Sequence, residues 1–241
     1  MAPADPAGSA ALVVLAGGSG SRVGAAANKV YLPLGGRRVI SWSFVWAREV
    51  IEIGRFVLVV RAADTALAAQ VLAAEVPGLP VEVVCGGDTR HASEQAALDL
   101  LAPAIRAGHV QVVAIHDGAR PLSGPDLFRS AIRTARRWGG AIPAVPADDV
   151  LPADGALPAD DGGRVMAVQT PQAFRAPELL AAYAAAGGTG FRGTDTASCL
   201  EAHSTLTVRV VPGSRRNLKV TFRHDLVAAE RLLAGTGQPG S

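Results

Sequence analysis

From Ala11 to Gly24 the chain reads Ala-Leu-Val-Val-Leu-Ala-Gly-Gly-Ser-Gly-Ser-Arg-Val-Gly. The apolar run Ala11–Leu15 predicts a buried strand, and the small residues that follow it predict a tight turn at its carboxyl end. Such a turn lets main-chain N–H groups approach a phosphate that a Cβ atom would keep away. Arg22 and Lys29 bring two cations to the same place. We therefore interpret the segment as a nucleotide-phosphate loop.

The spacing of the glycines excludes two common phosphate loops. Gly18, Gly20 and Gly24 form only a loose G-x-G-x-x-x-G, whose last glycine comes one residue later than in the dinucleotide fingerprint. The sequence contains no G-x-x-x-x-G-K-[ST], so the loop is not of the Walker type. A solvated glycine turn without a ligand is the alternative interpretation. Arg22 and Lys29 favour phosphate binding over that alternative.

The composition indicates a globular protein with neither a nucleic-acid partner nor a membrane partner. The 241 residues are 49% hydrophobic and carry a net charge of +2, which allows one substantial core and leaves no basic stripe. The sequence has neither an apolar run of bilayer length nor a secretory signal at its beginning. We expect Cys85 and Cys199 to be buried free thiols in a cytoplasmic protein.

Short apolar runs alternate with helical patterns along the first 145 residues. This order predicts an α/β fold with a mostly parallel sheet and helices on both faces, and it places ligand contacts beyond the carboxyl ends of the strands. The expected strands are Leu12–Ala16, Arg55–Val60, Val81–Val84, Val112–His116, Ala141–Val145 and Leu206–Val211. The expected helices are Val39–Val50, Asp64–Glu75, Thr89–Leu101, Asp126–Trp138, Ala176–Ala186, Asp195–Ala202 and Asp225–Ala234.

The composition changes between Pro146 and about Thr170, where proline, glycine and aspartate dominate. A long stretch without helix signal inside a compact domain is usually functional or disordered. We interpret it as a protruding hairpin arm at about residues 147–168. The whole chain, residues 1–241, is predicted to form a single domain with flexible tails at residues 1–9 and 235–241.

Several segments together resemble the 2-C-methyl-D-erythritol 4-phosphate cytidylyltransferase family, which makes 4-diphosphocytidyl-2-C-methyl-D-erythritol in the non-mevalonate isoprenoid pathway. In chain order they are Ala16–Arg22 with Lys29, Gly86–Ser93, His116–Pro121, Gln169–Gln172, Thr194–Ser198, and Asn217–Thr221 followed by Asp225. The similarity runs from residue 11 to about residue 233. The resemblance implies a single Rossmann-like nucleotidyltransferase domain, and a homodimer in which a β-arm clasps the second subunit.

The resemblance also implies a reaction, in which a phosphate oxygen of 2-C-methyl-D-erythritol 4-phosphate attacks the α-phosphorus of CTP and pyrophosphate leaves. Because that nucleophile is already an anion, the reaction needs charge neutralisation more than a general base. The implied catalytic residues are Arg22, Lys29, Lys219 and Arg164. The implied CTP-binding residues are Ala16, Gly17, Gly18, Ser19, Gly20, Gly87, Asp88, Arg90 and Ser93. The implied acceptor-binding residues are Asp117, Arg120, Asp149 and Lys219.

A divalent cation is part of this expectation. Mg²⁺, or another divalent cation, is expected to bridge the triphosphate, with Asp117 as a candidate ligand. Structural roles are the alternatives for the individual residues. Asp88 or Thr89 could cap a helix, Asp117 could be an ordinary turn aspartate, and Lys219 could be a solvated surface charge.

Three positions depart from the family pattern. Asn28 precedes Lys29 where the family commonly has a proline. Asp149 stands where a threonine often contacts the acceptor phosphate. Arg164 is the nearest counterpart of the family's arm arginine, but it lies too close in sequence to Gln169.

Three other functions stay open from the sequence. Another polyol-phosphate cytidylyltransferase, such as one acting on ribitol 5-phosphate, would differ only in the acceptor pocket, which is formed by Asp117, Asp149, Arg164 and Lys219. A nicotinamide-dependent oxidoreductase would need the tighter glycine fingerprint and an acid after the second strand, where Arg61 stands instead. A non-catalytic nucleotide-binding module is the third, and the pair Arg22 and Lys29 argues against it.

Overall fold

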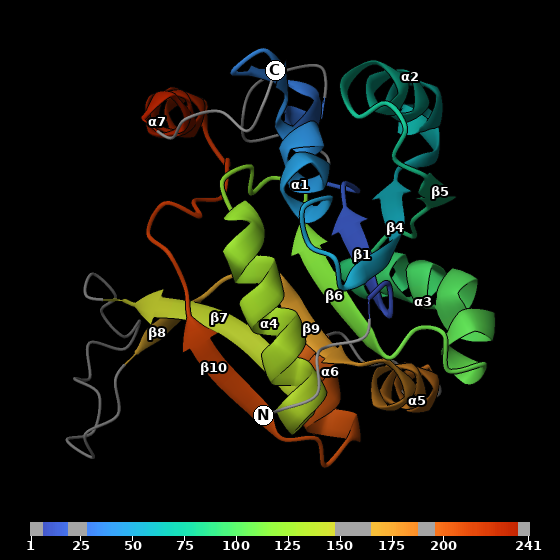
Figure 1. The fold of residues 1–241 in the computed structure, drawn as a ribbon. Coiled ribbons are helices and arrows are strands. Elements are labelled where there is room, and N and C mark those ends of the chain that lie inside the picture. The colour runs from blue at the N-terminus through green and yellow to red at the C-terminus, as the bar shows by residue number, and fades with distance from the viewer. Residues whose placement is uncertain (1–6, 19–27, 148–164, 188–195, 236–241) are drawn as a thin grey trace.

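The computed structural model describes residues 7–18, 28–147, 165–187 and 196–235, and these residues form a mixed sheet flanked by helices (Figure 1). The strand order is β10-β7-β9-β6-β1-β4-β5, and β8 pairs with β7. The strands are β1 (Ala10–Leu15), β4 (Ile53–Val60), β5 (Val81–Cys85), β6 (Val112–Asp117), β7 (Gly140–Pro146), β8 (Met166–Val168), β9 (Gln172–Arg175) and β10 (Val208–Pro212). A separate short hairpin joins β2 (Pro33–Leu34) to β3 (Arg37–Arg38).

The sheet is mostly parallel, as the sequence predicts. Strand β1 pairs in parallel with both β4 and β6, β4 pairs with β5 in the same sense, and β10 runs parallel to β7. The exceptions are β9, which runs antiparallel between β6 and β7, and β8, which runs antiparallel to the end of β7. The sequence analysis did not predict β9, whereas β8 lies within the predicted hairpin arm.

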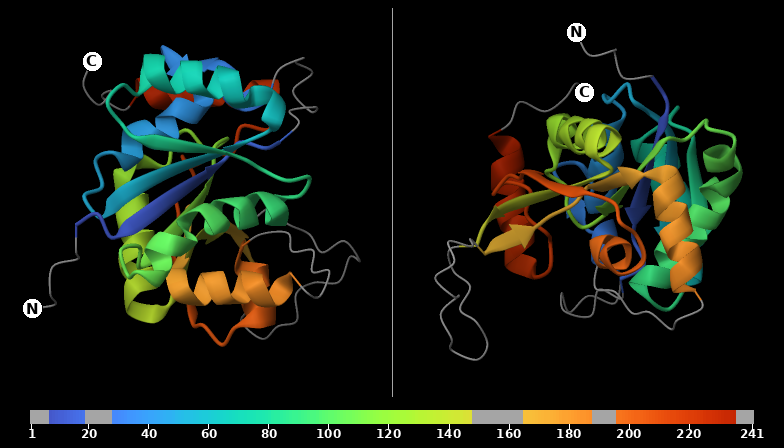
Figure 2. Two further views of the ribbon diagram at one scale, coloured as in Figure 1. Left: turned by 90° about the vertical axis from the view of Figure 1, so that its right-hand side faces the viewer. Right: turned by 90° about the horizontal axis from the view of Figure 1, so that it is seen from below.

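Helices cover both faces of the sheet (Figure 2). On one face lie α1 (Val39–Ala47), α2 (Thr65–Glu75), α4 (Gly124–Trp138) and α7 (Arg223–Ala234). On the other face lie α3 (Arg90–Arg106), α5 (Ala176–Ala186) and α6 (Thr196–His203). Alternate residues of β1 enter the two cores, with Leu12 and Val14 on the first face and Ala11 and Val13 on the second. This alternation follows from the two-residue repeat of a strand.

The predicted helices and main strands are present among the described residues, with ends that differ by a few residues. The largest difference is α3, which continues through Pro103 to Arg106 although the sequence analysis ends it at Leu101. Proline disfavours a helix interior because it lacks an N–H group. In α3 the face formed by Leu98, Leu101 and Ile105 remains buried across the proline, and this packing favours continuation of the helix.

The cysteine prediction was half wrong. Cys199 is buried in α6, and burial raises the pKa of its thiol to about 11. Cys85 is exposed because it is the last residue of β5, where the strand leaves the sheet.

The ends of the predicted arm belong to the sheet. Strand β8 pairs with the end of β7, and the Ala147 N–H donates to the Val165 carbonyl at 3.0 Å. This antiparallel pairing is what the base of a hairpin requires. Residues 148–164 of the predicted arm lie outside the described residues, as do residues 1–6 and 236–241 of the predicted tails.

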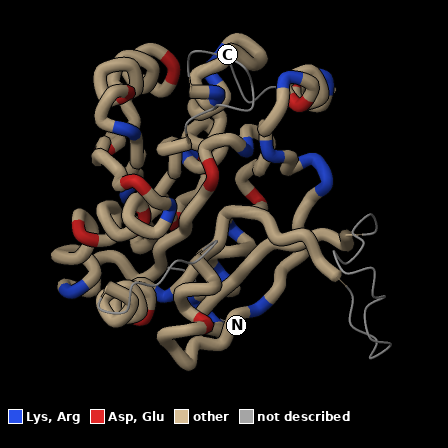
Figure 3. Tube along the Cα trace, turned by 180° about the vertical axis from the view of Figure 1, so that it is seen from behind, with Lys and Arg blue, Asp and Glu red and all other residues tan. Residues whose placement is uncertain are grey.

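Charged residues of both signs are scattered along the traced chain rather than gathered into one stripe (Figure 3). Among the described residues, none of the helices combines the length and the apolar character that a membrane span requires.

Candidate functional site

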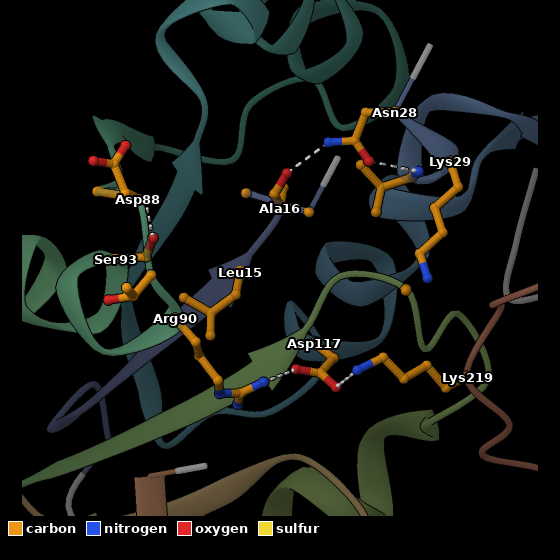
Figure 4. A pocket seen from close by; sticks show the side chains of 15 residues that line it. Leu15, Ala16, Asn28, Lys29, Asp88, Arg90, Ser93, Asp117 and Lys219 are labelled. Atoms are coloured by element: carbon orange, nitrogen blue, oxygen red, sulfur yellow. Dashed lines mark hydrogen bonds and ion pairs between the residues drawn. The ribbon is translucent and has the colours of Figure 1, made fainter. Parts of the chain in front are cut away.

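A cavity of about 450 Å³ opens where β1, β5 and β6 end. It therefore lies at the edge that a parallel α/β sheet normally uses for ligands. The predicted site residues that line it are Ala16, Gly17, Gly18, Lys29, Gly87, Asp88, Arg90, Ser93, Asp117 and Lys219 (Figure 4). Arg22, Ser19, Gly20, Asp149 and Arg164 lie outside the described residues.

The turn between β5 and α3 forms one wall of the cavity. An added Cβ at Gly87 would lie 2.5 Å from the Ala92 Cβ, so only glycine lets this turn fold against the first turn of α3. Thr89 caps that helix, because its Oγ1 accepts a hydrogen bond from the Ala92 N–H at 3.0 Å. The capping alternative is thus correct for Thr89. Asp88, which the helix does not need as a cap, lines the cavity.

Asp117 lies at the end of β6, between Arg90 and Lys219. We call these three residues the charged floor of the cavity. Its Oδ1 accepts a hydrogen bond from Arg90 Nη1 at 2.6 Å, and its Oδ2 accepts one from Lys219 Nζ at 2.7 Å (Figure 4). Arg120 Nε lies 3.8 Å from Oδ2. Burial alone would raise the pKa of Asp117, but Arg90 and Lys219 outweigh it and hold that pKa well below its usual range. Asp117 is therefore ionised.

Glu94 anchors Arg90 from behind. Arg90 Nε donates to Glu94 Oε1 at 2.9 Å, and the hydroxyl groups of Thr196 and Tyr183 also donate to this carboxylate. Glu94 is buried, and burial raises its pKa against the opposing effect of Arg90. The sequence analysis missed Glu94. The available signal was its place on the apolar face of α3, three and four residues before Ala97 and Leu98.

His116 and Thr170 support Asp117 from inside the protein. The Asp117 N–H donates to Thr170 Oγ1 at 3.0 Å, His116 Nδ1 lies 3.1 Å from that oxygen, and His116 Nε2 lies 3.2 Å from the Arg120 carbonyl. A carbonyl can only accept, so Nε2 carries the hydrogen and Nδ1 accepts from the Thr170 hydroxyl. Burial lowers the pKa of His116 to about 4, and the imidazole is neutral.

Arg120 is not among the residues that line this cavity. Its Nη1 donates to the Asn217 carbonyl at 2.8 Å, and its side chain is mostly buried. The Val220 N–H donates to the Ala119 carbonyl at 2.8 Å. Together these bonds tie the segment that carries Lys219 to the end of β6. The segment that carries Lys219 has no regular secondary structure.

Lysine usage is a signal that the sequence analysis did not use. The chain has 21 arginines and only two lysines, Lys29 and Lys219. Both lysines line this cavity. Every lysine of the chain therefore lines this cavity, and all other Lys or Arg positions in the sequence are arginines.

The described residues do not provide a metal site of their own. Within the described ranges, no three histidine, cysteine, aspartate or glutamate side chains come together in a way that could hold a metal ion. Both oxygens of Asp117 already accept hydrogen bonds from cations. Asp117 therefore does not fit the candidate role of metal ligand in this arrangement.

Comparison with known proteins identifies the family. The family model for 2-C-methyl-D-erythritol 4-phosphate cytidylyltransferase matches residues 10–235. The chain belongs to this family. It is therefore a cytidylyltransferase, an enzyme of the nucleotidyltransferase class.

Curated relatives and solved structures agree with this assignment. The chain is 37% identical over 236 residues to a 2-C-methyl-D-erythritol 4-phosphate cytidylyltransferase of Cereibacter sphaeroides, covering 93% of this chain and 96% of the relative. It is 35% identical over 225 residues to the enzyme of that name from Geobacillus kaustophilus, covering 92% and 96%. The crystal structure of 4-diphosphocytidyl-2C-methyl-D-erythritol synthase from Anaerococcus prevotii is similar, with a TM-score of 0.78, 28% identity, and 93% and 95% coverage. These likenesses confirm the Rossmann-like nucleotidyltransferase fold.

Proposed function

We propose that this cavity carries out the family's reaction, the transfer of CMP from CTP to 2-C-methyl-D-erythritol 4-phosphate with release of pyrophosphate. The observation that carries the proposal is the position of the two lysines. Lys29 lies beside the turn after β1, and Lys219 donates a hydrogen bond to Asp117. Both lysines line the same cavity. Two polyanions must meet in this reaction, and cations placed for both satisfy that need.

The CTP side is formed by two turns. We propose that the main chain of Ala16, Gly17 and Gly18 approaches the triphosphate, and that Lys29 stabilises the charge that develops on the α-phosphoryl oxygens. Gly87, Asp88, Arg90 and Ser93 form the opposite wall, where they would bind cytidine. The parts assigned to Arg22, Ser19 and Gly20 stay predictions from the sequence.

The acceptor side is formed by Asp117 and Lys219. Asp117 is an ionised carboxylate and would accept hydrogen bonds from acceptor hydroxyls. Lys219 would turn from Asp117 to the acceptor phosphate, because a phosphate dianion competes for an ammonium that now contacts one carboxylate oxygen. For Arg120 we propose a positioning role, since it holds the Lys219 segment through the Asn217 carbonyl.

The divalent cation, the dimer and the location remain proposals of the same kind. Since Asp117 does not fit as a ligand, we expect Mg²⁺ or another divalent cation to arrive on the triphosphate. The antiparallel base formed by β7 and β8 supports an arm, and a homodimer through that arm would bring Asp149 and Arg164 to the partner's acceptor site. A cytoplasmic location stays a prediction.

Pyrophosphate release tests the function directly. Purified protein with CTP and Mg²⁺ is assayed with 2-C-methyl-D-erythritol 4-phosphate, and in parallel with ribitol 5-phosphate. We expect release with the first acceptor only. Release with ribitol 5-phosphate alone would keep the fold and the CTP site and overturn the acceptor. Lys29→Ala should lower turnover by about a hundredfold or more, as for loss of a preorganised charge at a developing oxyanion.

A further inference from the structure

Asn28 is a buried amide at the edge of the cavity, immediately before Lys29. The residue is 2% exposed. Its Nδ2 donates to the Ala16 carbonyl at 2.7 Å (Figure 4) and to Asp64 Oδ2 at 3.2 Å, while its Oδ1 accepts from the Val30 N–H at 3.4 Å. Both hydrogens and the oxygen of the amide therefore have partners. Because the acceptors and the donor lie on opposite sides, only this orientation of the amide satisfies all three.

Asp64 is itself held by Arg61 at the end of β4. Arg61 Nε donates to Asp64 Oδ2 and Arg61 Nη2 donates to Asp64 Oδ1, both at 2.8 Å. The hydrogen bonds from Arg61 hold the pKa of Asp64 below its usual value. Asp64 is therefore a carboxylate without a proton, which requires a donor from Asn28. The geometry joins three segments, the end of β1, the start of the Lys29 segment and the end of β4.

The hydrogen bond between Asn28 and Ala16 links the start of the Lys29 segment to the end of β1. Ala16 follows the last residue of β1, and its N–H is bonded to the Val59 carbonyl at 2.8 Å, so it is fixed to the sheet. Lys29 directly follows Asn28 and opens the short 3-10 helix Lys29–Tyr31. A shift of Asn28 is therefore passed directly to Lys29, whose side chain points into the cavity (Figure 4).

The backbone angle alone does not explain an asparagine here. The φ of Asn28 is −60°, which is within the range that a proline ring imposes. A proline, common at this position in the family, could adopt the same φ but would make none of the three side-chain hydrogen bonds. The side-chain amide of Asn28 thus takes the place of the proline ring that the family commonly has at this position.

We propose that Asn28 is a positioning residue for Lys29, and that its amide, anchored on Ala16 and on the Asp64–Arg61 pair, fixes the ammonium in the CTP site. The proposal rests on the proposed function of Lys29. It assigns no chemical step to Asn28, since the side chain acts through the residue that follows it.

Three substitutions separate the amide from the backbone. Asn28→Ala removes the amide, Asn28→Pro removes it while keeping the backbone angle, and Asn28→Asp places a carboxylate against the Ala16 carbonyl and the ionised Asp64. The kinetics are measured with CTP varied at saturating acceptor. We expect kcat/KM for CTP to fall about tenfold to a hundredfold in the first two variants, as for a small displacement of a catalytic group. Asn28→Asp should lose more, because like charges then face each other.

A matched control is available on the acceptor side. Asn217 is also a fully buried asparagine, and its Nδ2 donates to the Thr170 carbonyl at 2.9 Å and to Gln169 Oε1 at 3.2 Å. Asn217→Ala should lower the melting temperature about as much as Asn28→Ala. CTP affinity, titrated without acceptor, should weaken only in the Asn28 variants.

Two results would overturn the proposal. Wild-type kcat/KM for CTP in Asn28→Pro would show that the backbone angle suffices. An equal loss of CTP affinity in Asn217→Ala would show that general destabilisation is the cause. The CTP titration also tests the positioning role of Asn28 independently of whether the proposed reaction is correct. If the wild type binds CTP without turning over 2-C-methyl-D-erythritol 4-phosphate, weaker CTP binding by Asn28→Ala still supports the positioning role.

Discussion

Protonation of His116 should destabilise the fold in mild acid. The ring is fully buried, and both of its nitrogens are committed, Nε2 as a donor to the Arg120 carbonyl and Nδ1 as an acceptor from the Thr170 hydroxyl. A second proton would place a donor on Nδ1 against the hydroxyl hydrogen. Burial lowers the pKa of His116 from 6.5 to about 4, with Asp117 opposing this and the cations Arg120 and Arg90 adding to it.

The sign and size of the effect follow from proton linkage. The pKa of His116 is lower in the folded protein than in the unfolded chain, so the unfolded chain takes up the proton first as the pH falls. The stabilisation is therefore complete above a pH of about 6.5 and is lost as the pH falls towards about 4. A pKa difference of this size corresponds to about 3 kcal/mol in total, and to about 2 kcal/mol between about pH 7 and about pH 5.

Urea unfolding of the wild type and of His116→Gln, between about pH 7 and about pH 5, measures this effect. Glutamine does not titrate, so the free-energy gap between the two proteins should shrink by about 2 kcal/mol as the pH falls. The comparison is needed because the raised pKa of Glu94 acts in the opposite direction, and because His91 also has a lowered pKa. Both groups are common to the two proteins. If the difference in free energy of unfolding between the two proteins did not change with pH, the conclusion that His116 is neutral and buried would be refuted.

Three further predictions concern the charges of the cavity and the arm. Replacing Lys29 or Lys219 by arginine should lower kcat/KM by about tenfold or more in the pyrophosphate assay although the charge is kept, because a planar fork does not replace a compact ammonium. Glu94→Ala should lower the free energy of unfolding by about 3 kcal/mol in urea titrations, because Arg90 then loses a buried partner. Wild-type stability in that variant would contradict the anchoring role. Deleting Asp149–Gly163 should weaken dimerisation in sedimentation experiments and raise KM for the acceptor, and a fully active monomeric wild type would contradict the clasp.

The central part of the fold could be predicted because its strands are buried on both faces. Strands such as β1 and β6 read as continuous apolar runs, which a sequence shows directly. Strand β9 could not be predicted in this way, since it has four residues and directly follows Pro171. Its position between β6 and β7 depends on pairing with strands distant in sequence, and no local pattern records such pairing.

The sequence indicated those site residues whose side-chain type alone suggests a role. It did not indicate residues whose role depends on contacts with residues distant in sequence. Lysines, glycines and a carboxylate at strand ends indicate phosphate chemistry by themselves. Asn28 and Glu94 act through contacts with residues distant in sequence, and the same residue types occur on many surfaces. Arg120 shows the converse, because a cation beside the predicted acceptor site contacts the chain's own carbonyl at Asn217.

The charged floor divides into a fixed cation and a movable one. Arg90 is held at two points, by Glu94 on Nε and by Asp117 on Nη1, and its side chain is 26% exposed. Lys219 contacts Asp117 at one point, and its side chain is 43% exposed. A polyanion that enters the cavity can therefore draw the partly exposed Lys219 away by breaking one ion pair, and the buried Asp117 keeps Arg90 as its cation. Drawing Arg90 away would leave Glu94 buried without its cation, which costs several kcal/mol. In the proposed reaction, Arg90 would therefore keep Asp117 ionised and in place for the acceptor hydroxyl groups, while Lys219 would leave Asp117 for the acceptor phosphate.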